Sequence, residues 1–289
     1  MSKLLIIALL ILGMLIVWGI CDIVYDVKTY RVTSYELLSA KIKKEFRFVV
    51  LSDLHNKAFG KNNDRLTAGI RRLRPDAVLI AGDMITATEN EDISGTVRLL
   101  TALAKEYPVY YSIGNHEEKL NRKRERYGSI YEDYMAALTK AGVTPLINEK
   151  ITLSDYGISI CGLQIESKYF KRFGLLPMSR EDLRRLVGVP EQDKYQILIA
   201  HNPDYFPQYA DWGADLVLSG HNHGGIIRVP FLGGLVSPRC VLFPKYDGGR
   251  FKEGQATLLL SRGLGTHTLP VRVLNHAELL SVTCRPKKS

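Results

Sequence analysis

The sequence has few cysteines and no paired cysteine spacing. Four occur among 289 residues, and they are Cys21, Cys161, Cys240 and Cys284. None belongs to a C-x-x-C pair, and Cys21 lies in an apolar segment, which leaves an odd three. This pattern argues against a disulfide framework and against a zinc knuckle.

The sequence also lacks internal repeats, low-complexity tracts and any basic stripe interleaved with aromatic residues. Its net charge is +9, but without such a stripe we expect no nucleic-acid partner. Basic residues instead gather in patches, which are Lys119, Arg122, Lys123, Arg124 and Arg126; Lys168, Lys171 and Arg172; and Arg180, Arg184 and Arg185. Such patches are commonly solvated faces, and the alternative is that they attract an anionic substrate or anionic headgroups. Oligomeric state cannot be inferred from these features.

No small-x-small cleavage site follows the long hydrophobic run at the amino terminus. Leu4 to Ile20 carries no charge and is long enough to cross about 30 Å of hydrocarbon. We therefore predict an uncleaved, single-pass anchor in the cell membrane. Residues 1–33 form this anchor and its connector, and residues 34–289 form one domain. The basic residues that flank the run leave the side of the membrane open.

Apolar strands and amphipathic helices alternate in the first half of the domain. Strands are expected at 48–51, 77–81 and 109–113, and helices at 63–73, 96–105 and 130–141. Further strands are expected at 151–153, 157–162, 195–200, 215–218, 256–261 and 278–283. This order predicts an α/β (α+β) fold in which two packed mixed β-sheets are flanked by helices.

Metal-type side chains follow five of these strands. Parallel strands present their carboxyl ends at one edge of a sheet, where ligands bind. The donors at these ends are Asp53 and His55, Asp83, Asn115, His201, and His221 and His223. Seven oxygen or imidazole donors are too many for one tetrahedral ion and suit two ions that share a carboxylate. Asp83 is the natural bridge, while His116 and Asn222 remain for substrate or structure.

The motifs D-x-H, G-D, G-N-H-E, H and G-H-x-H occur here in that order, from Asp53 to His223. Their series resembles the calcineurin-like metallophosphoesterase superfamily, and SGHNHGG and SRGLGTHTLPVR resemble a bacterial membrane-associated branch of it. The resemblance implies the calcineurin-like four-layer sandwich, with two divalent ions (Mn, Fe or Zn) at the strand ends. It implies that the first ion is bound by Asp53, His55 and His223, and the second by Asn115, His201 and His221. The same resemblance implies that Asp83 bridges the ions and that His116 is the catalytic histidine beside the leaving group.

A site of this kind hydrolyses phosphate esters without a protein nucleophile. The expected substrate is a phosphodiester or pyrophosphate, in a lipid-linked or cell-envelope molecule such as UDP-2,3-diacylglucosamine. Soluble nucleotides or sugar phosphates are the alternative, as is a non-catalytic membrane protein on the same scaffold. Glu117 either orients a metal ligand or His116, or it is an exposed loop carboxylate. Arg262 and His267 are expected to be structural.

Overall fold

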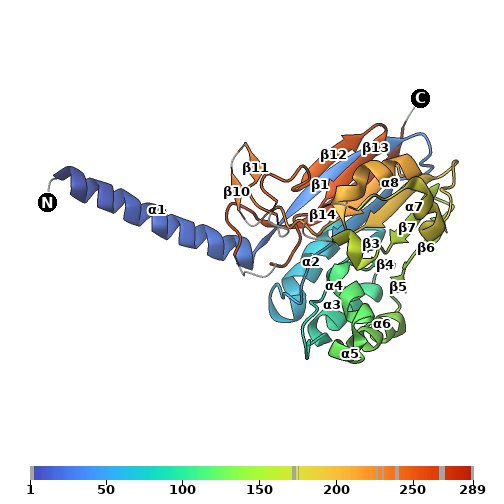
Figure 1. The fold of residues 1–289 in the computed structure, drawn as a ribbon, viewed down its shortest axis with the longest axis horizontal. Coiled ribbons are helices and arrows are strands. Elements are labelled where there is room, and N and C mark those ends of the chain that lie inside the picture. The colour runs from blue at the N-terminus through green and yellow to red at the C-terminus, as the bar shows by residue number, and fades with distance from the viewer. Residues whose placement is uncertain are drawn as a thin grey trace.

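Two six-stranded sheets face each other in the computed structural model, which describes residues 3–170, 174, 176–225, 227–229, 231–237, 241–266 and 271–287 (Figure 1). The first sheet has the order β1 (Tyr30–Ser39), β14 (Ala277–Pro286), β2 (Phe46–Leu51), β3 (Ala77–Ala81), β4 (Val109–Ser112), β5 (Thr144–Pro145). The second has the order β12 (Gly249–Glu253), β13 (Ala256–Leu260), β9 (Leu216–Ser219), β8 (Tyr195–Ala200), β7 (Ile158–Leu163), β6 (Glu149–Leu153). Both sheets mix parallel and antiparallel pairs. The predicted α/β fold with two mixed sheets is confirmed.

Alternating side chains of the central strands fill three hydrophobic cores. Phe48 and Val50 of β2 point into the core between the sheets, whereas Val49 and Leu51 point toward the helices on the outer face. Because both faces are covered, such strands are continuous apolar runs and not alternating ones. The helices on the first sheet are α2 (Asp64–Leu73), α3 (Ser94–Ala104), α4 (Asn115–Arg122), α5 (Arg124–Tyr127) and α6 (Ile130–Lys140), and those on the second are α7 (Arg180–Val187) and α8 (Phe206–Trp212). The result is four layers.

Sequence reasoning missed the edge strands β1 and β12 and the short helices α4, α7 and α8. β1 pairs in parallel with β14 along all its length, from Tyr30 opposite Ala277 to Ser39 opposite Pro286. Its burial alternates strictly only from Thr33 to Ser39, and its apolar residues do not follow a period of two over the whole strand, so the sequence pattern does not mark it as a strand. The expected boundary after residue 33 therefore falls inside β1.

Helix α1 (Lys3–Lys28) projects away from the sheets (Figure 1). It is long and apolar enough to cross a membrane, with a mean hydropathy of 3.0 in its most apolar window. A signal sequence near an amino terminus has the same properties. A small hairpin, β10 (Arg228–Val229) and β11 (Gly233–Gly234), lies near the end at which α1 meets the domain.

Candidate metal centre

The strand ends of both sheets bring the expected donor residues to one place. Asp53 and His55 follow β2, Asp83 follows β3, and His221 and His223 follow β9. All five have positive φ angles, between 49° and 72°. Such conformations are costly for residues other than glycine and persist where the surrounding structure enforces them, often at functional sites.

Asp53, His55 and His223 form the first group of donors. The Nε2 atoms of His55 and His223 lie 3.1 Å apart, and His223 Nε2 lies 3.2 Å from Asp53 Oδ1. One ligand atom from each residue falls within 4.8 Å of the others. Two imidazoles and a carboxylate at this spacing form a site that a single divalent ion can occupy.

Asp83, His201 and His221 form the second group. His201 Nε2 lies 3.1 Å from Asp83 Oδ2 and 3.7 Å from Asp53 Oδ1, so the two groups adjoin. Asn115 Oδ1 and His221 Nε2 are buried without a hydrogen-bond partner among the described residues. Buried polar atoms are normally satisfied, so these two atoms fit the role of ligands for a cation.

His116 approaches the site from the start of α4. Its Nε2 lies 4.0 Å from Asp83 Oδ2. His55, Asp83 and His116 also form a third group of side chains that could hold a metal ion. The backbone N–H of Ala87 donates to His116 Nδ1 at 2.8 Å. Because Nδ1 is the acceptor, the neutral ring carries its proton on Nε2, the atom that faces the donors.

Further hydrogen bonds orient the side chains of the donor groups. His201 Nδ1–H donates to the carbonyl of Ala81 at 2.6 Å, which directs Nε2 inward as in histidine ligands generally. Asp53 accepts from Ser52 Oγ at 2.5 Å and from the backbone N–H of His221 at 3.0 Å. A Cβ at Gly220 would lie 2.2 Å from Asp53 Oδ2, so only glycine allows this close approach.

Glu117 is fully buried and holds two ligand loops together. Its carboxylate accepts from the backbone N–H groups of Asp83 (3.0 Å), Met84 (2.8 Å) and Gly114 (3.0 Å). Tyr111 Oη donates to the same carboxylate at 2.7 Å. Of the two interpretations of Glu117, the structure supports the orienting one, although it acts on the backbone and not on the ring of His116.

Two residues that sequence reasoning did not single out support the site from the connection between β13 and β14. Arg272 is 2% exposed, and its guanidinium donates to the carbonyls of Arg262, Gly263 and Gly265. Asn275 Nδ2 donates to the carbonyls of His223 and Gly225. Neither position has a local signal beyond its place in or just after the SRGLGTHTLPVR stretch. His267 lies outside the described residues.

The buried charges of the site favour a cation. Burial opposes ionisation of Asp53 and Asp83, but the neighbouring histidines outweigh it and hold the pKa of each carboxyl below its usual value. Burial also disfavours charge on His201, yet Asp83 and Asp53 raise the pKa of His201 to about 10. Burial lowers the pKa of His221 to about 3, so its ring is a neutral ligand at pH 7. At pH 7 the carboxylates therefore hold a proton on His201, and a divalent ion that binds there would displace it.

The basic patches are largely neutralised by ion pairs. The pairs are Arg122–Glu118, Arg124–Glu132, Arg126–Glu89, Lys168–Glu166, Arg184–Glu181 and Arg185–Asp182. This favours the solvated-face interpretation of these residues. Lys171 and Arg172 lie outside the described residues.

Comparison with known proteins finds relatives that are named as phosphoesterases. The family model for "Calcineurin-like phosphoesterase" matches residues 46–225, more than half of the chain. The chain is 27% identical to the uncharacterized metallophosphoesterase YkuE of Bacillus subtilis, over 83% of this chain and 79% of that protein. It is 28% identical to phosphodiesterase YaeI of Escherichia coli, over 76% of each chain. The uncharacterized metallophosphoesterase Cj0846 of Campylobacter jejuni is 29% identical over 90% of this chain and 65% of its own length.

Proposed function

Because the chain belongs to the calcineurin-like phosphoesterase family and is thereby a phosphoester hydrolase, we propose that it cleaves a phosphodiester or pyrophosphate bond at a dinuclear metal centre. The substrate is a lipid-linked or cell-envelope molecule at a membrane surface. The observation that carries the dinuclear site is the adjacency of two donor groups that meet at Asp53 and His201. The name of YaeI, a phosphodiesterase, supports a diester.

The donor groups suggest which residues hold each ion. Asp53, His55 and His223 would hold the first, and the second would be held by Asn115, His201 and His221 (with Asp83 shared between them). Bound there, two divalent ions would activate a water and neutralise charge on the phosphoryl oxygens. The metal could be manganese, iron or zinc, since imidazole and carboxylate donors suit all three.

In this proposal His116 acts on the leaving group. Its Nδ1 is occupied by the N–H of Ala87, so Nε2 presents a proton toward the donor groups. A positioned acid of this kind contributes about 10²–10⁴-fold to turnover. Glu117 fixes the backbone on either side, because it joins the Asp83 loop to the first turn of α4.

The attachment of α1 to the site supports a membrane substrate. Asp22 accepts from the N–H of Leu274 at 3.0 Å, and Asp26 accepts from the N–H of Asn275 at 2.7 Å. Asn275 in turn bonds the carbonyl of His223. If α1 spans the membrane, the metal centre is held close to the bilayer surface, which raises the local concentration of membrane substrates. UDP-2,3-diacylglucosamine is the named candidate.

Hydrolysis is tested with the purified full chain, manganese and bis-p-nitrophenyl phosphate. Asp83→Ala should abolish cleavage, whereas the control Asp193→Ala, a carboxylate that is 75% exposed, should not. Loss of activity in neither variant would contradict the proposed role of Asp83. Failure of the wild type with every divalent metal, on monoesters and diesters alike, would contradict hydrolysis at this site.

The substrate class is tested with the full chain and with a chain that begins at Asp22. The shorter chain keeps Asp22 and Asp26, the two carboxylates that bond α1 to the domain. UDP-2,3-diacylglucosamine in vesicles is compared with soluble nucleotides and sugar phosphates. We expect the full chain to turn over the lipid faster than the truncated chain does. Equal turnover of soluble esters by both forms, with none of the lipid, would favour a soluble substrate instead.

A further inference from the structure

Exposed apolar side chains gather in one segment of the domain, residues 227–243. Phe231 is fully exposed, Leu232 is 68% exposed and Leu242 is 66% exposed, and Ile227, Val241 and Phe243 are exposed beside them. Elsewhere in the described chain beyond α1, large apolar residues are exposed singly, at Val32, Leu38 and Val189. A contiguous exposed apolar patch marks an interaction surface.

The backbone presents these side chains outward in a strained form. Phe231 has φ 67° and Phe243 has φ 46°, in the left-handed region that bulky residues rarely adopt. β10 pairs with β11, and the N–H of Phe243 donates to the carbonyl of Leu235 at 2.9 Å. The described residues of this segment therefore hold the side chains of Phe231 and Phe243 in solvent.

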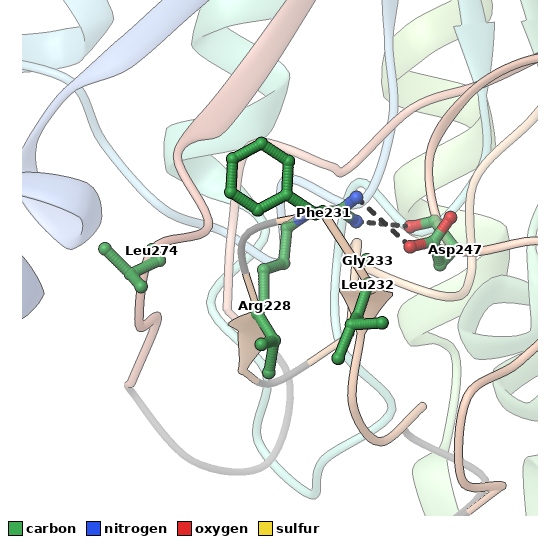
Figure 2. Close-up of a pocket in the computed structure, with 7 residues that line it drawn as sticks. Arg228, Phe231, Leu232, Gly233, Asp247 and Leu274 are labelled. Atoms are coloured by element: carbon green, nitrogen blue, oxygen red, sulfur yellow. Dashed lines mark hydrogen bonds and ion pairs between the residues drawn. The ribbon is translucent and has the colours of Figure 1, made fainter.

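This segment lies beside the end of α1. Phe231 and Leu232 line a pocket together with Arg228, Asp247 and Leu274 (Figure 2). The N–H of Leu274 is bonded to Asp22 of α1, so a single residue separates the helix from the apolar hairpin.

The length of α1 sets where a bilayer surface would lie. Residues 4–21 are uncharged and rise about 27 Å as a helix, close to the thickness of the hydrocarbon layer. Asp22 then stands at the boundary, with Leu274 and the hairpin beside it. On the domain at the same end of α1, Lys28, Arg65 and Arg72 line a second pocket. Cations at this level attract anionic headgroups.

We propose that the β10–β11 hairpin and the turn at residues 241–243 insert into the leaflet that surrounds the end of α1. The inference rests on the proposed membrane location and deepens the proposed function. Arg228 Nη1 donates to the carbonyl of Gly224 at 2.9 Å, next to His223. The inserted hairpin is therefore bonded directly to the loop that carries His221 and His223. The substrate class that this arrangement favours is a phosphate ester whose lipid tail stays in that leaflet.

Tryptophan fluorescence tests the insertion in the full chain. The protein has two tryptophans, Trp18 in α1 and the buried Trp212. Phe231→Trp is made in a Trp18→Phe background, and Val189→Trp in the same background is the control. Val189 is 61% exposed and follows α7, on the side of the domain away from α1 (Figure 1). Each variant, and the unmodified chain with its native Trp18, is reconstituted in phosphatidylglycerol and phosphatidylcholine vesicles, with and without bromine on the upper acyl chain.

We expect bromine to reduce the emission of Phe231→Trp well beyond that of Val189→Trp, with a blue shift on reconstitution. Quenching of native Trp18 with no difference between the two variants would overturn the insertion and leave the anchor intact. Absence of quenching at Trp18 would overturn the anchor and the insertion together. Hydrolysis of bis-p-nitrophenyl phosphate, measured alongside, reports on the metal centre independently of both outcomes.

Discussion

Glu117→Gln is expected to loosen the metal centre without touching a ligand. The substitution keeps the shape of the side chain but replaces one carboxylate oxygen with an NH₂ group. One oxygen of Glu117 accepts from the N–H groups of Asp83 and Gly114, and the other accepts from the N–H of Met84 and from Tyr111 Oη. An amide nitrogen at either place therefore meets two donors.

The hydroxyl of Tyr111 can turn and accept, but a backbone N–H cannot. At least one buried N–H is left without an acceptor, and the remaining bonds lose the negative charge, so we expect about 3 kcal/mol of destabilisation. For a chain of this size that lowers Tm by about 5 °C. Since Glu117 positions Asp83 and the first turn of α4, metal affinity should fall about 10–100-fold.

Calorimetry and metal titration measure both effects against the control Glu125→Gln, which removes an exposed carboxylate from α5. A surface change of this kind is expected to alter stability by less than about 0.5 kcal/mol. If Glu117→Gln matched Glu125→Gln in Tm and in metal affinity, the carboxylate would not hold the loops, and the argument would be refuted.

Two further predictions concern the histidines and the thiols. His116→Ala should lower turnover of esters with poor leaving groups about 10²-fold or more, while metal analysis still finds two ions. His221→Ala should instead reduce the metal content. Equal metal loss in both variants would contradict these separate roles. Burial raises the pKa of Cys161 and Cys284 to about 12. In a variant that lacks the other two cysteines, a thiol reagent at pH 8 should therefore label neither thiol until denaturant is added. Rapid labelling of the native protein would show that these thiols are accessible.

The sequence by itself indicated where the central strands lie along the chain and which residues follow them. A strand such as β8 is buried on both faces, so its apolar run is visible locally, and the donor His201 directly follows its last residue, Ala200. The structure brings the aspartate and histidine donors into adjoining groups, because parallel strands bring their carboxyl ends to a common edge. The edge strand β1 was not predicted, because it is recognised as a strand only from its pairing with β14.

Only the tertiary structure decided which contacts support the donors. Glu117 binds amides that lie more than 30 residues away in the sequence, at Asp83 and Met84. Asp26 of α1 reaches Asn275, which bonds the carbonyl of His223. Such contacts depend on how distant segments pack, and no local period or motif encodes the distance between them. The types of the candidate donors were therefore readable from the chain, whereas their orientation and their link to α1 required the folded molecule.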